Sequence, residues 1–382
     1  MRRIYLDHNA GAPQHAEVTR AMLACLEEDC GNPSSVHEAG RRGRARLEES
    51  RQAIAALLHA DPAGVVFTSG ATEANNLALW GRVGAAPGGA HLVVAEVEHP
   101  SVREAANAVA AAGGAVSWVG VDREGRVDPE AVLRAVTSAT RLVSVQVANP
   151  ETGVLQALPA IAARLRPRGV PLHADAAQAV GRIRVAVDEL GVDLLTLSGH
   201  KLGGPRGTGA LWVRPGCALQ PRQVGGGQER GMRAGTENVP GAVGLAAAAR
   251  LAVRTLERAG EIEARRDRLA AALVGLWPGA AVHGAGAARL PNTCSVCLPG
   301  LDGEIAVARL DLDGIAVSMG SACSVGTLRP SQVLRAMGVS EALARASLRF
   351  SLGPDTGDDE IDETIARFAR AFVADGVGER EH

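Results

Sequence analysis

Short apolar runs alternate with stretches of helical spacing from residue 64 to about residue 214. The runs that predict strands cover residues 64–68, 91–95, 115–120, 141–147, 170–174, 194–197 and 209–213. This alternation is typical of a mainly parallel sheet covered by helices on both faces. Because ligands bind at the carboxyl ends of the strands in such sheets, we expect functional residues directly after the predicted strands.

The pattern changes on both sides of this region. Residues 1–15 have no regular period, residues 16–30 have helical spacing, and a charged helix is expected over residues 38–59. A long helix rich in alanine, arginine and leucine is expected over residues 240–276. Shorter strands and helices are expected from residue 281 onward.

The length of 382 residues fits two domains of unequal size. We expect a large α/β domain over residues 16–250 and a small α+β domain formed by residues 1–15 and 251–382. Hydrophobic residues make up 46% of the chain and aromatic residues only 2%, so the core is expected to be aliphatic.

Charge and composition exclude several classes of partner. The formal net charge of −2 argues against binding to nucleic acid. No apolar run approaches the roughly 20 residues that a membrane span needs, and the first residues lack the apolar stretch of a signal peptide. The six cysteines are irregularly spaced, unlike a disulfide framework. We therefore expect a cytoplasmic protein with no membrane or nucleic-acid partner and no metal site.

Lys201 is the only lysine in the chain. Lysine and arginine together number 40, so the other 39 are arginines. Arginine serves solubility and ion pairing, but it cannot lose a proton near neutral pH and attack a carbonyl, as a Schiff-base lysine does. Lys201 follows the apolar run 194–197 and precedes the glycine loop 203–207. An amine at the end of a buried strand predicts an aldimine with pyridoxal 5'-phosphate (PLP); the alternative is a surface lysine without a function.

Other candidate residues follow the other predicted strands. Residues 69–72 form a strand-to-helix turn whose backbone N–H groups can bind a phosphate, although the same residues can make an ordinary helix cap. His99 could stack on a flat ring and move protons, or it could be structural. Asp175 could keep the pyridine nitrogen of PLP protonated, or it could cap a helix.

Eight motifs together indicate a known family. They are residues 31–35 (GNPSS), 68–76 (TSGATEANN), 98–100 (EHP), 173–178 (HADAAQ), 198–201 (SGHK), 225–230 (GGGQER), 233–238 (RAGTEN) and 320–323 (GSAC). The chain resembles the cysteine desulfurases of the NifS/IscS family, within the class V aminotransferase group of fold-type I PLP enzymes. The resemblance covers nearly the whole chain and departs from the usual family pattern around His8, at Pro150 and at Ala234.

The resemblance implies a role for each matching residue. Lys201 would form the aldimine, Asp175 would pair with the pyridine nitrogen, and His99 would stack on the ring and relay protons. Gln178 would contact the ring hydroxyl, and the phosphate would be held by Ala71, Thr72, Ser198 and His200. Asn149 would lie beside the cofactor and, together with Arg349, would bind the substrate carboxylate. Thr236 would contact the phosphate of the other subunit. The last role requires a homodimer.

The cysteines compete for the role of sulfur acceptor. Three are expected to be packing residues or to have no special role: Cys25, Cys30 and Cys217. Cys294 and Cys297 have C-x-x-C spacing, but they lie in a predicted strand, where positions three apart face opposite sides. Cys323 lies in a run of small residues, and a loop of that kind can present a reactive thiolate. The family motif implies the same role for Cys323.

The sequence thus predicts a PLP-dependent L-cysteine desulfurase. It would convert L-cysteine to L-alanine and hold the sulfur as a persulfide on Cys323 for an acceptor protein such as an iron–sulfur scaffold. Two alternatives stay open. A selenocysteine lyase or another class V aminotransferase-like PLP enzyme would use the same cofactor site, and a non-catalytic sulfur-relay protein would need Cys323 but not Lys201.

Overall fold

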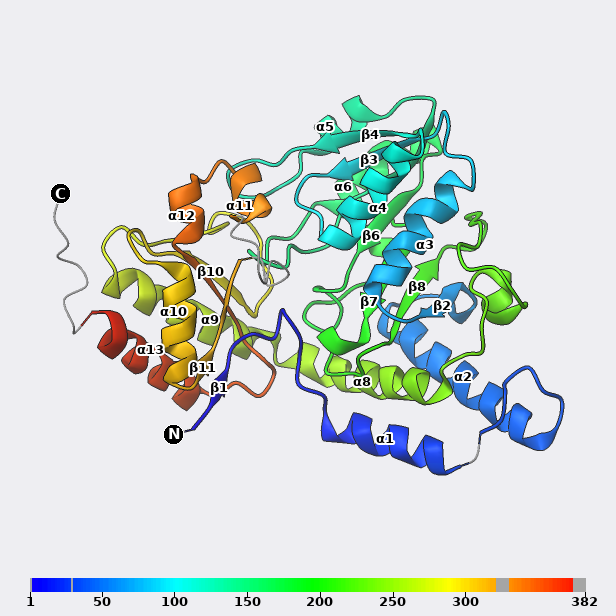
Figure 1. Ribbon diagram of the computed structural model, residues 1–382, viewed down its shortest axis with the longest axis horizontal. Helices are drawn as coiled ribbons and strands as arrows, with labels where there is room; N and C mark the ends of the chain where they lie inside the picture. The colour runs from blue at the N-terminus through cyan, green and yellow to red at the C-terminus, as the bar shows by residue number, and fades with distance from the viewer. Residues whose placement is uncertain (1, 29, 321–329, 374–382) are drawn as a thin grey trace.

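The computed structural model describes residues 2–28, 30–320 and 330–373. Its larger half is built on a seven-stranded sheet in the order β2-β8-β7-β6-β5-β3-β4 (Figure 1). The strands are β2 (Val65–Thr68), β3 (His91–Ala95), β4 (Ala115–Val119), β5 (Thr140–Ser144), β6 (Leu172–Asp175), β7 (Leu194–Ser198) and β8 (Gly209–Val213). Strand β8 runs antiparallel to its neighbours β2 and β7, and the other neighbouring pairs are parallel. The predicted mainly parallel sheet is confirmed.

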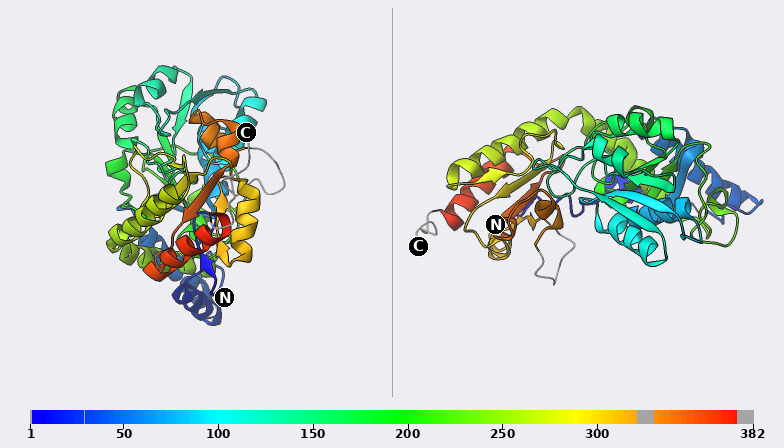
Figure 2. Two further views of the ribbon diagram at one scale, coloured as in Figure 1. Left: turned by 90° about the vertical axis from the view of Figure 1, so that its left-hand side faces the viewer. Right: turned by 90° about the horizontal axis from the view of Figure 1, so that it is seen from above.

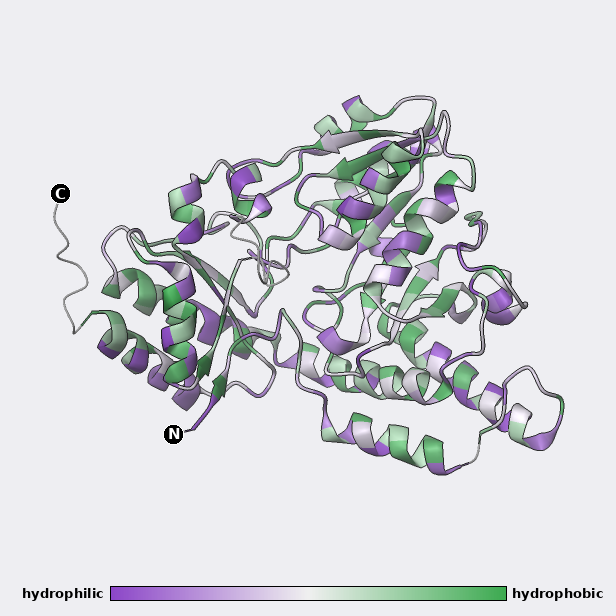
Figure 3. Ribbon diagram, in the orientation of Figure 1, coloured by the Kyte–Doolittle hydropathy of each residue, from purple (hydrophilic) through white to green (hydrophobic). Residues whose placement is uncertain are grey.

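Both faces of this sheet are buried over most of its strands, which explains why strands such as β3 and β8 are largely apolar. Val93 and Leu195 pack into the core on one face, whereas their neighbours Val94 and Leu194 pack into a second cluster on the other face. Successive side chains of a strand point to opposite faces, so each strand must be apolar on both. Figure 3 shows much of the sheet in the hydrophobic colour, whereas the helices mix hydrophobic and hydrophilic colours along their length.

Two groups of helices cover the sheet. Helices α3 (Ala71–Val83) and α4 (Pro100–Ala111) pack on one face. The other face is covered by α2 (Glu38–Leu57), α6 (Leu158–Leu165) and α8 (Val239–Glu257), with α1 (Ala16–Glu27) lying against α8. Shorter elements of this part of the chain include α5 (Pro129–Ala135), α7 (Val187–Leu190), η1 (Pro62–Gly64) and η2 (Arg166–Arg168).

The smaller half lies beside the larger one (Figure 2) and contains an antiparallel sheet in the order β12-β13-β10-β9. These strands are β9 (Ala281–Val282), β10 (Thr293–Cys297), β12 (Ser318–Met319) and β13 (Ser347–Ser351). Its helices are α9 (Ala259–Leu276), α10 (Gly303–Leu312), α11 (Gln332–Ala336), α12 (Glu341–Arg345) and α13 (Asp358–Phe372). Phe350 and Phe368 are among its fully buried side chains.

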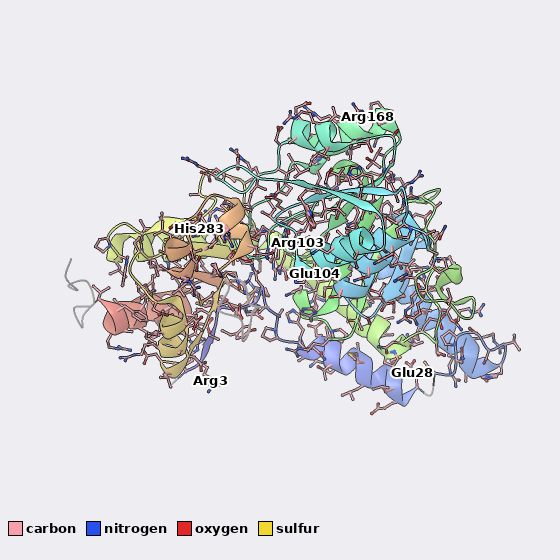
Figure 4. The ribbon with its side chains drawn as sticks, turned by 45° about the horizontal axis from the view of Figure 1, so that its top comes forward. Arg3, Glu28, Arg103, Glu104, Arg168 and His283 are labelled. Atoms are coloured by element: carbon pink, nitrogen blue, oxygen red, sulfur yellow. The ribbon has the colours of Figure 1, made fainter. Side chains whose placement is uncertain are left out.

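The first residues of the chain join the smaller half. Strand β1 (Ile4–Tyr5) pairs in parallel with β11 (Ile315–Ala316), and Ile4 and Leu6 pack in the same cluster as residues 262–372. Arg3 and His283, far apart in the sequence, lie in this half together (Figure 4). Val333, Leu334 and Met337 pack instead on the core of the larger half. The predicted domain limits of 1–15, 16–250 and 251–382 stay a prediction.

The long helix predicted over residues 240–276 is two helices. Helix α8 ends at Glu257 and α9 begins at Ala259, because Arg258 between them leaves the helical conformation, with φ −101° and ψ 7°. Gly260 in the first turn of α9 further weakens helix continuity. Within the described residues α8 is the one helix long and apolar enough to cross a membrane, but half of it is buried, as in a core helix.

A buried ion pair attaches the loop that contains η4 (Gln228–Gly231) to the large sheet. The Arg51 guanidinium donates to both carboxylate oxygens of Glu229, each at 2.9 Å, and lies 5.0 Å from the centre of the Phe67 ring. Glu229 also accepts from the backbone N–H of Phe67 at 2.9 Å. Glu229 and Arg230 both have positive φ, 46° and 57°. The ion pair holds this strained turn in place.

We expect Arg51→Ala to lower the free energy of unfolding by about 3–5 kcal/mol, because Glu229 would be left as an unpaired buried charge. The measurement is urea unfolding of the full-length protein at equal cofactor saturation. Arg42→Ala is the matched control on the same helix, since Arg42 pairs with Glu38 at the surface, and its effect should stay within about 0.5 kcal/mol. Equal unfolding midpoints for the two variants would contradict the interpretation.

Candidate active site

A cavity of about 680 Å³ lies at the carboxyl ends of the parallel strands. It is lined by eight of the predicted site residues: Ala71, Thr72, His99, Asp175, Gln178, Ser198, His200 and Lys201. Each follows or ends a strand, because the parallel strands finish at the same edge of the sheet. Residues separated by more than a hundred positions therefore meet in one cavity.

Lys201 ends the short helix η3 (Gly199–Lys201), which follows β7 directly. Its Nζ donates to the backbone carbonyls of Asn9 and Ala10, at 2.9 Å in the case of Ala10. Gln178 also donates to the Asn9 carbonyl, at 3.0 Å. The segment after β1 thus positions the amine from the side opposite the sheet.

The turn into α3 has the form of an anion site. Gly70, at φ 153°, precedes the helix, and within the described residues the backbone N–H groups of Ala71 and Thr72 have no hydrogen-bond partner. A helix N-terminus with free N–H groups attracts a phosphate. A Cβ at Gly209 would come 2.7 Å from the Gly70 Cα, so glycine at 209 lets β8 support the turn closely.

Asp175 ends β6, and its carboxylate is held on both oxygens. Oδ1 accepts from the backbone N–H of Ala177 at 2.9 Å, and Oδ2 accepts from Asn75 Nδ2 at 2.8 Å. Asp175 is only 7% exposed. A carboxylate fixed in this way at a strand end suits a protonated pyridine nitrogen.

The histidines of the cavity are kept neutral by burial. His99 is the residue before α4, and its Nδ1 lies 2.8 Å from Ser101 Oγ and accepts from the Ser101 N–H at 3.1 Å. Burial lowers the pKa of His99, and Lys201 adds to this effect while Asp175 opposes it. Burial and then the charge of Lys201 lower the pKa of His200 to about 4. His200 Nδ1 lies 2.9 Å from Ser198 Oγ.

Glu98, beside His99, is a fully buried acid. Burial first, and then the nearby Asp175, raise the pKa of the Glu98 carboxyl well above its usual range. Its Oε1 accepts from the backbone N–H of Gln146 at 2.6 Å, and within the described residues Oε2 has no partner. Burial thus disfavours a second negative charge beside Asp175.

The other predicted site residues do not line this cavity. The Oδ1 of Asn149 accepts from the backbone N–H groups of Glu151 and Thr152 and its Nδ2 donates to the Val97 carbonyl, so the side chain holds its own turn. Thr236 is exposed on the loop after η4. Their predicted roles stay predictions, and Cys323 lies outside the described residues.

Arg349 on β13 is 2% exposed and is held at the edge of the cavity. It donates to Asp7 Oδ1 at 2.7 Å and to the carbonyl of Pro150, a cavity-lining residue, at 3.2 Å. Within the described residues its Nε has no partner. A buried guanidinium N–H without an acceptor suits a ligand carboxylate.

These residues fit PLP in charge and in the type of donor. The cavity offers one amine, an anion site at a helix N-terminus, a fixed carboxylate and neutral histidines. Lys201 would hold the cofactor covalently, the α3 turn with Ser198 and His200 would hold its phosphate, and Asp175 would face its ring nitrogen.

A family model for class V aminotransferases matches residues 4–364. The chain belongs to the class V aminotransferase family. "Cysteine desulfurase 2" of Trichormus variabilis is 41% identical over 95% of this chain and 91% of its own length. Among solved structures, a "NifS-like protein" has a TM-score of 0.89 at 33% identity, covering 97% of this chain and 99% of that one. The structure titled "SspA in complex with cysteine" has a TM-score of 0.79 at 31% identity, covering 92% and 99%.

This class V aminotransferase has the expected fold and uses the expected PLP cofactor, and its predicted resemblance to cysteine desulfurases is confirmed. Four contributors to the site were not singled out from the sequence: Asn9, Asn75, Ser101 and Asp7. Asn75 lay in the quoted motif of residues 68–76 without an assigned role. An asparagine inside a predicted helix, where its propensity is poor, is a signal that could have drawn attention to Asn75 without giving it a role.

We expect borohydride to fix PLP on Lys201 and on no other side chain, because no other side chain can form the imine. Lys201→Ala and Lys201→Arg should both lose the visible band of the bound cofactor and the reduced adduct, since arginine keeps its charge but cannot react. Absorption spectra and peptide mass spectrometry measure the two outcomes. A reduced PLP adduct inside the chain of Lys201→Ala would refute the assignment.

Proposed function

We propose that this protein is a PLP-dependent L-cysteine desulfurase that forms L-alanine and carries the sulfur on Cys323. The observation that carries the proposal is the position of the only lysine, at the end of β7 in a cavity that also contains Asp175 and His99. The name of the Trichormus variabilis relative and the cysteine complex of SspA support the choice of substrate.

Bound PLP supplies an electron sink for the pair of electrons released at the substrate α-carbon. The protein supplies the remaining parts. Asp175, fixed by Asn75 and Ala177, holds a negative charge toward the ring nitrogen. Lys201, once its amine is free, moves the α-proton, and the carbonyls of Asn9 and Ala10 keep that amine in place.

Sulfur transfer requires a nucleophile that the described part of the cavity does not contain, and we assign this role to Cys323. Its thiolate attacks the substrate sulfur, an S–S bond forms and the substrate C–S bond breaks. The electron pair of that bond stays with carbon, which takes up a proton and leaves as alanine. The enzyme keeps a persulfide, and His99 is placed to move a proton near the sulfur.

We assign the substrate carboxylate to Arg349. Asp7 and the Pro150 carbonyl fix its guanidinium, and the buried Nε without a partner in the described residues is left for the ligand. A planar guanidinium held on two sides binds a carboxylate in one orientation. Asn149 would assist by shaping the turn that presents Pro150.

A homodimer with shared sites is the second part of the proposal. Thr236 is exposed and lies outside the cavity of its own chain, which suits a contact with the phosphate of the other subunit. Arg233 near it pairs with Glu73, a cavity-lining residue at the start of α3, at 2.8 Å. Two anchors, this pair and Arg51–Glu229, set the position of the Thr236 loop.

The persulfide would pass to an acceptor protein such as an iron–sulfur scaffold, in the cytoplasm. The nucleophile Cys323 must be a reduced thiol before each turnover, which suits the cytoplasm, where thiols stay reduced, and in the described part of the chain all five cysteines are free thiols. Cys294 and Cys297 are buried in β10, and burial raises their pKa, to about 11 for Cys294. These two thiols are poorly suited to replace Cys323.

We expect Cys323→Ser to keep the PLP spectrum and the spectral change on addition of L-cysteine, while alanine formation falls by several orders of magnitude. Cys217→Ser is the control and should retain activity. The measurements are absorption, alanine release and mass spectrometry of trapped persulfide. Full alanine release by Cys323→Ser would contradict the proposal. Release of selenium from selenocysteine, without release of sulfur from cysteine, would favour the selenocysteine lyase alternative.

We expect Thr236→Ala and Lys201→Ala subunits to complement each other when mixed. A heterodimer has one intact site, with Lys201 from one chain and Thr236 from the other, so roughly a quarter of wild-type PLP binding and activity should return. The control is the Thr236→Ala/Lys201→Ala double variant mixed with wild type, in which heterodimers contain no intact site. A fully active monomer, or wild-type PLP affinity of Thr236→Ala alone, would overturn the shared site.

A further inference from the structure

A buried asparagine connects two residues of the active site. Asn75 on α3 has no exposed surface, and its Nδ2 donates to Asp175 Oδ2 and to Ser101 Oγ, each at 2.8 Å. An amide nitrogen carries two hydrogens and accepts none, so Asn75 is the donor in both contacts. The opposite orientation of the amide would place its oxygen against the Asp175 carboxylate, which excludes it.

The second contact determines the direction of the next hydrogen bond. Ser101 Oγ accepts from Asn75, so its own hydrogen is free to donate to His99 Nδ1, 2.8 Å away. The backbone N–H of Ser101 donates to the same nitrogen at 3.1 Å. His99 Nδ1 therefore faces two donors and carries no proton itself. In the neutral ring the proton must be on Nε2, the nitrogen remote from Ser101.

Protonation of Nδ1 would disturb the whole chain of hydrogen bonds. The Ser101 hydroxyl would have to turn and accept from His99 while it still accepts from Asn75. Its own hydrogen would then be directed away from both partners in a region where Ser101 is 9% exposed. A buried donor without an acceptor costs free energy, so the arrangement resists protonation of Nδ1.

The Asn75 amide is oriented by these two contacts. Its Oδ1 is buried and has no partner within the described residues, so only the two Nδ2 donations determine how the amide lies. Asn76, the next residue, donates instead to the Thr72 carbonyl of its own helix at 2.9 Å. Asn76 is partly exposed and contacts neither Asp175 nor Ser101, whereas Asn75 is buried against both.

We propose that Asn75 is a positioning residue that couples Asp175 to His99, fixing the Asp175 carboxylate and holding His99 as the neutral ring with its proton on Nε2. The proposal rests on the proposed function, in which Asp175 and His99 serve the same reaction. In this arrangement one side chain positions both the carboxylate that faces the ring nitrogen of the cofactor, Asp175, and the proton carrier, His99.

Other groups also act on His99. Burial and Lys201 oppose its positive charge, while Asp175 favours that charge. His200 lies close enough for its own charge to be disfavoured by His99, and burial disfavours the charge of Glu98, the neighbour in sequence. In Asn75→Ala these groups all remain, so a change in the His99 titration reports the loss of the Asn75 contacts.

The test is NMR titration of the histidine ring nitrogens in the full-length protein with PLP bound. The His99 signal is assigned by its loss in His99→Gln. We expect the Nε2-protonated neutral ring in the wild type. In Asn75→Ala the Ser101 hydroxyl becomes free to accept from Nδ1–H, so the pKa of His99 should rise by roughly one unit. The acid limb of kcat/KM should move to higher pH by a similar amount, because the neutral ring persists only at higher pH.

Two further variants separate a positioning role from a general loss of stability. Asn76→Ala removes a side-chain hydrogen bond to the backbone of the same helix and should leave the His99 titration unchanged. In the Ser101→Ala background, Asn75→Ala should change the pKa of His99 much less than in the wild type, because the connection between them is gone. Should Asn75→Ala not fold, Ser101→Ala alone should raise the pKa of His99, though by less.

Two outcomes would overturn the proposal. One is an unchanged His99 titration in folded Asn75→Ala, and the other is the same shift in Asn76→Ala. The result is independent of the proposed function. A His99 shift in a protein that releases no alanine from cysteine would refute the desulfurase and leave the coupling standing. Full desulfurase activity of the wild type, together with an unchanged pKa of His99 in Asn75→Ala, would refute the coupling and leave the desulfurase standing.

Discussion

The arrangement of the site depends on the backbone around Asn9. Its carbonyl accepts from Lys201 and Gln178 in the larger half, while its own N–H donates to Ser351 Oγ on β13. Its side chain donates to the Pro150 carbonyl and accepts from Asn292. Asn9 is 1% exposed. A buried polar residue must satisfy all its hydrogen-bonding groups, and Asn9 does so only where the two halves meet. Because Lys201 donates to the Asn9 carbonyl, this requirement fixes the position of Lys201 relative to both halves of the molecule.

The sequence predicted the large sheet well and the N-terminal segment poorly, for a physical reason. Strands β3 and β8 begin and end at the predicted residues, because strands buried on both faces are continuous apolar runs. Strand β1 has two residues, and its pairing with β11 joins positions about 300 residues apart. No local period records such a contact. The break at Arg258 was missed because composition continued across it.

The same distinction applies to the site. Residues that follow strands, such as Asp175 and Lys201, could be predicted, because topology brings strand ends together. Asn75 could not be assigned a role, since its two partners lie at the end of β6 and in the first turn of α4, and only the fold brings them to one helix. Asp7 is a similar case, because its pairing with Arg349 requires the N-terminal segment to reach β13.

The restriction of lysine to one position has a consequence for the chemistry of the whole surface. The 39 arginines supply the positive charge that other proteins share between two residue types. Aldehydes, acyl donors and other amine-directed reagents therefore find a single side-chain target, and it is the one in the cavity. Any reaction of this protein with free PLP in excess leads to the productive site or to the chain terminus. The surface therefore has no lysine side chain with which the cofactor can react.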